Sequence, residues 1–339
     1  MNQYKTVFTS ERGERHRQTS LDAAPEVLDV TMLYRPDRET LAAELRDADY
    51  LISERVGTID KALLAGAPQL KLIQRLGSMA YDIDTQAAKE AGVAVCTWPD
   101  ETVIRVSEHL VMQMLALSKK LRESERIALE ASSEWGESRR TDEDTFAYNW
   151  SKRRNVDGLW RKTVGIIGFG EIGAELARRL QTWGVRLLYN KRRGLPDEAE
   201  AELKLTYTEV EALLAESDYV VNLLPFTPQT EMWLDGEKLA LMKDETRLVS
   251  CGSGSVIDEQ ALADAIRAGK LGGAALDTFE WEPLRPQNPL IGLAREGYNV
   301  LLTPHIAAGA VAAVAQARVT DYSNILAHIE GRPLQYQVV

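Results

Sequence analysis

Apolar and polar positions along the chain alternate between short strand-like runs and longer helix-like stretches. In the first third, β-branched apolar runs at residues 48–54, 70–77 and 93–98 are separated by helical stretches at 37–48 and 84–92. Strands that alternate with helices are typical of a parallel sheet covered by helices. This part of the chain therefore predicts one α/β unit.

Residues 106–130 keep an apolar face at helical spacing and predict one long helix that leaves the first unit. Residues 131–160 follow, a polar stretch with scattered aromatic residues and no periodic pattern. A stretch of this length without secondary structure is either a solvated linker or an arm that packs on another subunit. The sequence favours neither alternative.

The clearest local signal is a glycine-rich turn at residues 168–173, which reads Gly-Phe-Gly-Glu-Ile-Gly. It follows the apolar strand 164–167 and leads directly into a helical stretch. In that context Gly168 makes the tight turn, Gly170 lets a pyrophosphate approach the backbone, and Gly173 allows close packing of helix on strand. The free N–H groups at the start of the helix favour phosphate. These residues predict a dinucleotide site.

The next strand ends at Asn190, where an NAD-binding protein usually carries an acidic residue for the ribose hydroxyl. Lys191, Arg192 and Arg193 follow. A neutral Asn removes repulsion toward a 2′-phosphate, and the cations could pair with it. The alternative is a solvated basic turn. We expect NADP(H) to be favoured, with NAD(H) possible.

Composition and charge narrow the class of protein. The 339 residues, with 45% hydrophobic and 27% charged, are enough for two domains with buried cores. The net charge of -11 disfavours nucleic acid and anionic membranes as partners, and no membrane-length apolar run or leader pattern occurs. We expect a cytoplasmic protein. Two cysteines, Cys96 and Cys251, are too few for a disulfide framework or a metal cluster, so no metal is expected.

Several motifs occur along the chain: the glycine-rich turn, PFTPQT (225–230), VIDE (256–259), GAALDTFEWEP (273–283), TPHIAAG (303–309) and NILAHIEGRPL (324–334). Together they give the chain a strong resemblance to the D-isomer-specific 2-hydroxyacid dehydrogenase family, over nearly its whole length. The resemblance implies two doubly wound parallel-sheet domains, Rossmann-like and flavodoxin-like, with a cleft between them. A split substrate-binding domain would comprise residues 1–105 and 306–339, and an NAD(P)-binding domain residues 106–305. It also implies a homodimer, with 131–160 as the dimerisation arm.

The chemistry of such a family requires a hydride carrier, a proton carrier and a cation for the substrate carboxylate. His305 is the natural proton carrier because imidazole titrates near neutral pH. Glu282 matches the partner carboxylate, which would favour the imidazolium and orient the ring. The other three histidines, His16, His109 and His328, are expected to be structural or solvated.

The third requirement is where the chain departs from the family. Relatives carry Arg in an Asn-x-Ala-Arg-Gly loop, and the matching residues here are Ser250–Gly254, with Ser253 at the Arg position. A guanidinium holds a carboxylate with two charge-assisted hydrogen bonds, whereas a hydroxyl offers one neutral donor. The position of this loop is therefore that of a substrate-binding loop, but the positive charge that relatives carry there is absent.

The substrate loop of the first domain also differs. Where relatives resemble Gly-Val-Gly, this chain has Gly77, Ser78 and Met79, and Met79 adds bulk to the expected pocket. Two altered edges of one pocket suggest a changed substrate. Arg105 is the first choice for a replacement cation, because the start of the long helix should face the cleft. Arg75 and Arg285 are the other candidates, although an arginine in any of these three positions is more often a surface ion-pair partner.

Three functions are consistent with these residues. The first is an NAD(P)-dependent oxidoreductase that interconverts a 2-oxo acid, or related carbonyl, and a D-2-hydroxy acid, with His305 carrying the proton. The second is a dehydrogenase whose substrate lacks an ordinary carboxylate. The third is a non-catalytic NAD(P)-binding or regulatory protein, against which the retained dyad argues. The residues expected to bind the cofactor are Gly168, Gly170, Glu171, Ile172, Gly173, Asn190, Lys191, Arg192, Pro225, Thr230, Cys251, Gly252 and Asp277.

Overall fold

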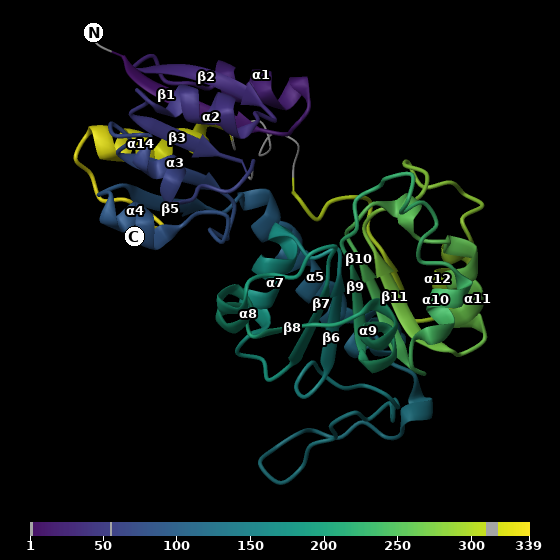
Figure 1. The fold of residues 1–339 in the computed structure, drawn as a ribbon. Coiled ribbons are helices and arrows are strands. Elements are labelled where there is room, and N and C mark those ends of the chain that lie inside the picture. Colours follow the sequence, from purple (N-terminus) through teal and green to yellow (C-terminus); the bar gives the residue numbers. More distant parts are fainter. Residues whose placement is uncertain (1–2, 55, 310–317) are drawn as a thin grey trace. The chain divides into compact units, whose positions relative to one another are not determined.

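The chain divides into two compact units in the computed structural model, which describes residues 3–54, 56–309 and 318–339. Unit 1 combines Met1–Arg105 with Ala308–Val339, and unit 2 is Val106–Ala307 (Figure 1). Each unit contains one parallel sheet with its own covering helices.

Unit 1 is built on a five-stranded parallel sheet in the order β2-β1-β3-β4-β5. One apolar cluster joins the sheet to α2, α3 and α4, and a second cluster places Tyr322 and Ile325 of the C-terminal segment against Phe8 and Leu72. The elements are β1 (Tyr4–Ser10), α1 (Glu14–Asp22), β2 (Leu28–Tyr34), α2 (Arg38–Leu45), β3 (Tyr50–Ser53), α3 (Lys61–Ala65), β4 (Leu72–Leu76), α4 (Thr85–Glu90), β5 (Ala94–Trp98), η3 (Arg318–Tyr322) and α14 (Ser323–Ile329).

The sequence pattern did not predict β1 and β2. Thr6, Thr9 and Ser10 make β1 look half-polar, yet their exposed fractions are 0–1%, because the strand is paired on both sides. A strand enclosed on both edges and both faces can bury hydroxyls that bond to backbone carbonyls, as Thr9 Oγ1 does to Ile52 O at 3.5 Å. The alternation of polar residues in β1 therefore hid the fact that it is an interior strand of the sheet.

Unit 2 is built on a seven-stranded parallel sheet in the order β12-β11-β10-β9-β6-β7-β8. The order reverses between β6 and β9, and ligands of such sheets bind outside the carboxyl ends of the strands at this point. Helix α5 (Glu101–Ser118) begins in unit 1, and its residues from Val106 on belong to unit 2. The other elements are α6 (Leu121–Glu130), η1 (Ser133–Trp135), β6 (Thr163–Ile167), α7 (Glu171–Leu180), β7 (Arg186–Asn190), α8 (Asp197–Leu203), β8 (Leu205–Tyr207), α9 (Val210–Glu216), β9 (Tyr219–Asn222), α10 (Gly236–Leu241), β10 (Thr246–Ser250), η2 (Gly254–Val256), α11 (Glu259–Arg267), β11 (Leu271–Leu276), α12 (Pro289–Glu296) and β12 (Val300–Leu302).

The prediction of one helix over residues 106–130 was wrong. Helix α5 begins earlier, after Asp100, whose side chain accepts from the Thr102 N–H at 2.8 Å. It ends at Ser118, and α6 starts at Leu121 because Lys120 has a φ of +47°, which a right-handed helix cannot include. Two helices replace the long one, and the apolar pattern continues across the break.

Residues 131–160 contain only the short η1 and otherwise irregular chain, and Figure 1 shows them extending away from the sheet of unit 2. Their end is anchored near the start of β10, where Arg247 pairs with Asp157 at 3.2 Å. The Asp157 N–H also donates to Ser118 O at 3.1 Å. Residues 131–160 are called the arm below. The arm is thus attached at the amino end of β10, whereas the residues predicted to bind the cofactor and carry the proton follow the carboxyl ends of the strands.

The fold class expected from the sequence is confirmed, since both units are doubly wound parallel α/β structures. Among the described helices, none combines the length and apolar character needed to cross a lipid bilayer.

Candidate active site and nucleotide site

The glycine-rich turn joins β6 to α7 in the expected way. Gly168 has a φ of +78°, and a Cβ there would lie 2.6 Å from Leu224 N, so a side chain is excluded twice over. A Cβ on Gly173 would meet the Phe169 ring at 2.8 Å. By contrast, a Cβ on Gly170 would find nothing nearer than Gly168 O at 4.0 Å. The turn is closed where helix and strand pack and open where a phosphate would approach.

The loops after β9 and β10 pack against this turn. A Cβ on Gly252 would lie 2.8 Å from Leu224 O, and the Gly252 N–H donates to Asn222 O at 3.0 Å. The loop after β9 is closed by Thr230, whose Oγ1 donates to Pro225 O at 2.8 Å. The loops that follow the carboxyl ends of β6, β9 and β10 therefore meet at one edge of the sheet, where the strand order reverses. Ile172 and the buried Glu171 lie there too, in the first turn of α7.

At the end of β7, the Asn190 carbonyl accepts from the N–H groups of Gly168 and Phe169 at 3.1 and 3.2 Å. Its side-chain amide donates to Thr208 O at 2.9 Å. Arg192 and Arg193 are exposed in the turn that follows, beside Lys191. Neither guanidinium has a hydrogen bond or ion pair with any residue that the structure describes. Two uncommitted cations thus stand beside a neutral strand end.

His305 and Glu282 are in direct contact within unit 2. Glu282 Oε2 lies 2.7 Å from His305 Nδ1, and Glu282 Oε1 accepts from the Phe279 N–H at 3.0 Å. Because a carboxylate only accepts, Nδ1 carries the hydrogen and Nε2 faces away from the pair. His305 has a φ of +53°, an unusual backbone conformation for a non-glycine residue. The arrangement is a carboxylate-oriented imidazole.

The loop after β10 lies beside the loop that carries Glu282. A Cβ on Gly254 would lie 2.0 Å from the Phe279 carbonyl carbon, so the two backbones touch. Thr278 Oγ1 donates to Gly252 O at 2.5 Å. The Ser253 N–H donates to Leu224 O at 2.9 Å, while its hydroxyl bonds to no described residue. Ser253 thus offers a free hydroxyl on a loop in backbone contact with the loop of the dyad.

Asp277, the first residue after β11, is fully buried and holds the segment around His305. Its carboxylate accepts three hydrogen bonds, from Thr303 Oγ1 at 2.6 Å and from the N–H groups of Ile306 and Ala307 at 3.1 and 2.8 Å. His109 Nε2, from α5, lies 3.1 Å from Thr303 Oγ1 and 3.6 Å from Asp277 Oδ1. Burial lowers the pKa of His109, which keeps its imidazole neutral at pH 7.

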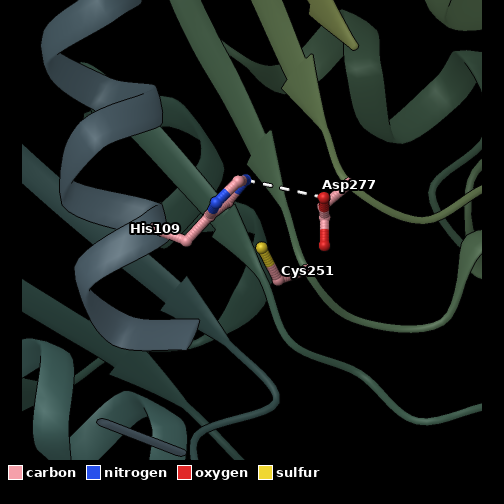
Figure 2. Close-up of side chains that lie close together, drawn as sticks. All are labelled: His109, Cys251 and Asp277. Atoms are coloured by element: carbon pink, nitrogen blue, oxygen red, sulfur yellow. Dashed lines mark ion pairs between the residues drawn. The ribbon is translucent and has the colours of Figure 1, made fainter. Parts of the chain in front are cut away.

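His109, Cys251 and Asp277 offer possible ligand atoms within 4.8 Å of one another (Figure 2). Two features favour a hydrogen-bonded cluster over a metal centre. The Asp277 oxygens already accept three hydrogen bonds. Burial raises the pKa of the Cys251 thiol, which stays protonated and donates to Gln113 Oε1 at 3.6 Å, whereas a metal ligand would be the thiolate. We therefore assign no metal to this cluster.

The three arginines that could replace the missing cation differ in their existing contacts with other side chains. Arg75 is fully buried on β4, and its Nε donates to both Asp82 oxygens at 3.0 Å, so its charge is internally balanced. Arg285 lies over the Trp281 ring at 3.4 Å. Arg105 pairs with Glu101 at 2.8 Å on the exposed start of α5. Of the three, Arg75 is the least available to a ligand.

The expected substrate loop lies in unit 1 at the end of β4. Gly77 has a φ of +124° and exchanges two backbone hydrogen bonds with Trp98, at 2.8 and 3.1 Å. Ser78 and Met79 are both 5% exposed. The bulk that Met79 adds is therefore packed inside unit 1.

Three residues that were not assigned to the site from the sequence contact residues that were assigned to it. His109 was expected to be structural or solvated, and Gln113 and Thr303 were not considered. His109 and Gln113 are four residues apart, which places both on one face of α5. That spacing, together with Thr303 two residues before His305, was the available signal.

Comparison with known proteins places this geometry in a family. Residues 111–307 match the family model described as D-isomer specific 2-hydroxyacid dehydrogenase, NAD binding domain. A glyoxylate reductase of Thermococcus onnurineus is 35% identical over 270 residues, which are 79% of this chain and 76% of that protein. A D-3-phosphoglycerate dehydrogenase of Mycobacterium leprae is 33% identical over 303 residues, 89% of this chain, so the chain spans only 52% of that relative.

Solved structures show the same likeness. The PH0520 protein of Pyrococcus horikoshii matches with a TM-score of 0.58 and 27% identity, over 99% of this chain and 95% of that one. A D-lactate dehydrogenase of Aquifex aeolicus, complexed with NAD and lactic acid, matches with a TM-score of 0.54 and 26% identity, over 96% of each chain. The chain belongs to the D-isomer-specific 2-hydroxyacid dehydrogenase family.

Proposed function

We propose that the chain is an NAD(P)-dependent oxidoreductase that interconverts a 2-oxo acid, or a related carbonyl compound, and a D-2-hydroxy acid. The observation that carries this proposal is the 2.7 Å contact between His305 Nδ1 and Glu282 Oε2 beside the nucleotide edge of unit 2. A protein that only bound a nucleotide would have no use for an oriented proton carrier. Membership of the family supports the same conclusion.

The dyad handles the proton of the reaction. In the reducing direction, the protonated His305 Nε2 donates its proton to the carbonyl oxygen as the hydroxyl forms, and solvent then restores it. Glu282 fixes the ring orientation and stabilises the imidazolium, because its carboxylate accepts the Nδ1 hydrogen throughout. In the oxidising direction, the neutral ring takes the hydroxyl proton. His305 and Glu282 are thus the proposed catalytic pair.

The glycine-rich turn fits a dinucleotide. The space at Gly170 and the N–H groups at the start of the ten-residue α7 would hold the pyrophosphate. A nicotinamide nucleotide bound there supplies or takes up the hydride. Pro225, Thr230, Cys251, Gly252 and Asp277 lie on the adjoining strand ends and are the proposed wall of this site.

NADP(H) is the proposed preference within this class. Asn190 brings no negative charge to the end of β7, and its amide is already turned to Thr208 O. Arg192 and Arg193 are exposed and uncommitted among the described residues, so either could pair with a 2′-phosphate. NAD(H) would not gain from these cations.

A second candidate is a dehydrogenase of a substrate without an ordinary carboxylate. The observation that favours it is Ser253, whose hydroxyl has no hydrogen-bond partner in the described part of the chain and whose loop touches the loop of Glu282. A neutral donor suits an amide, hydroxyl or carbonyl oxygen better than a carboxylate. Substrate recognition by Gly77, Ser78, Met79 and Arg105 remains part of the proposal for either class, as does a homodimer formed through the arm.

The deciding experiment measures NADPH and NADH oxidation by the purified protein with a panel of 2-oxo acids and a matched panel of uncharged carbonyl compounds. His305→Ala is run alongside, and Glu282→Gln tests the partner. Turnover that His305→Ala abolishes would support the oxidoreductase, and the better panel would name the substrate class. Tight nucleotide binding without turnover on either panel would favour a non-catalytic binding protein. The cytoplasmic location stays a prediction from the sequence.

A further inference from the structure

Helix α5 presents His109 to the segment that carries His305. The His109 side chain is 10% exposed, and its Nε2 lies 3.1 Å from Thr303 Oγ1. Figure 2 shows the ring directed at the Asp277 carboxylate, and both residues belong to unit 2. The contact joins α5 to a loop nearly two hundred positions later in the chain.

The direction of each hydrogen bond in this chain of contacts can be deduced. Thr303 Oγ1 has one hydrogen, and Asp277 Oδ1 lies 2.6 Å away. An ionised carboxylate cannot donate, so the Thr303 hydroxyl donates to Asp277. The Leu276 carbonyl oxygen, 3.5 Å from Thr303 Oγ1, cannot donate either. Thr303 Oγ1 must therefore accept in its contact with His109, and His109 Nε2–H is the donor. This order requires the His109 tautomer with hydrogen on Nε2.

The order matters because Asp277 holds the backbone on the far side of His305. Asp277 accepts from the Ile306 and Ala307 N–H groups, while the His305 N–H donates to Thr303 O at 3.0 Å. Hydrogen bonds to Thr303 and Asp277 thus fix the backbone on both sides of His305, which has a φ of +53°. Without a donor at position 109, the Thr303 hydroxyl could turn to Leu276 O, now 3.5 Å away.

We propose that His109 is a positioning residue for His305, acting through Thr303 and Asp277. The inference rests on the proposed function, in which His305 carries the proton, and adds a residue that touches neither reacting group. His109 acts as a hydrogen-bond donor and does not exchange a proton in the reaction. A donor of the same reach should replace it, whereas an apolar side chain of similar size should not.

The tautomer provides a test that needs no turnover. The chain has four histidines, so selective ¹⁵N labelling of the rings gives four pairs of imidazole nitrogen signals, which His→Gln variants can assign. We expect His109 at pH 7.5 to be neutral with hydrogen on Nε2. The Thr303→Val variant should shift the His109 Nε2–H signal and also the His305 ring signals. Hydrogen on Nδ1 of His109, or His305 signals that do not move, would overturn the proposal.

The kinetic test compares His109→Gln, which keeps a donor near the Nε2 position, with His109→Met, which removes it. We expect His109→Met to lower kcat at least about tenfold, since a misplacement of about 1 Å can cost about a hundredfold. His109→Gln should stay within about threefold of the parent protein, and both variants should keep the parent KM for the cofactor.

Thr303→Val completes a double-mutant cycle. Because His109 acts through Thr303, adding His109→Met to Thr303→Val should cause little further loss of kcat. Equal losses in the Gln and Met variants, or fully additive losses in the double variant, would show a merely structural role and refute the inference. If the parent protein turns over no substrate, the proposed function fails, and the tautomer experiment alone decides the role of His109.

Discussion

At the scale of single residues, Ser253 is the proposed determinant of which substrates the site can hold. Its hydroxyl is free among the described residues and lies on a loop whose backbone touches Phe279, three positions before Glu282. A carboxylate placed there would meet one neutral donor in place of a guanidinium. The cations proposed as substitutes are engaged to different degrees, and Arg75 is balanced by Asp82.

Ser253→Arg should therefore shift the substrate preference toward 2-oxo acids. A guanidinium makes two charge-assisted hydrogen bonds with a carboxylate, and losing such a donor commonly costs about 10²- to 10³-fold in rate. We expect kcat/KM for a 2-oxo acid to rise about a hundredfold relative to an uncharged carbonyl of the same size. Ser253→Gln is the control for side-chain length. An equal gain in the control would mean that the charge is not responsible.

At the scale of elements, the turn after β7 sets the proposed cofactor preference. Arg192→Ala and Arg193→Ala should each reduce the ratio of kcat/KM for NADPH to that for NADH, because each removes an uncommitted cation. We expect about a tenfold reduction for the residue that contacts the 2′-phosphate, which corresponds to about 1.4 kcal/mol. Lys204→Ala, in the exposed turn after α8, is the control. An unchanged ratio in both arginine variants would contradict the NADP(H) preference.

A second element-scale prediction concerns the contact between the loop of Ser253 and the loop of Glu282. Gly254→Ala would place a methyl group 2.0 Å from the Phe279 carbonyl carbon, so one backbone must move. We expect the free energy of unfolding to fall by about 3 kcal/mol. Gly292→Ala in α12 is the control, since its nearest contact would be 3.6 Å and it should gain up to about 1 kcal/mol. Chemical denaturation measures both, and an unaffected Gly254→Ala would refute the tight contact.

Some of the observed elements could be predicted from the sequence, and others could not. The glycine-rich turn was predictable because local context gives each glycine a task, and Gly168, Gly170 and Gly173 behave as expected. The break at Lys120 was not predictable, since nothing in its identity requires a φ of +47°. Strand β1 was missed because its buried hydroxyls resemble a polar surface. His109 was undervalued because its partners, Thr303 and Asp277, are brought to it only by the fold.

At the scale of the whole molecule, the arm is the proposed contact surface for a second copy of the chain. Three of its aromatic side chains are strongly exposed, with fractions of 70% for Phe146, 85% for Tyr148 and 66% for Trp160. Clustered exposed apolar groups commonly mark an interaction surface. The arm has six acidic and five basic residues and is nearly neutral, while the chain carries a net charge of -11. Contact through the arm would thus limit repulsion between two acidic copies.

The proposed homodimer predicts a mass in solution of about twice the 37.8 kDa of one chain, measurable by sedimentation equilibrium. Replacing Phe146 and Tyr148 together with Ser should raise the dissociation constant at least about a hundredfold, because exposed aromatic groups contribute much of the energy of such contacts. Leu241→Ser on α10, 44% exposed and outside the arm, should leave the mass unchanged. A parent protein with the mass of a single chain would refute the dimer. A double variant that stays dimeric would place the interface elsewhere. Because the arm is anchored at the amino end of β10, turnover by a monomeric double variant would show that the dyad at the opposite edge functions without a partner chain.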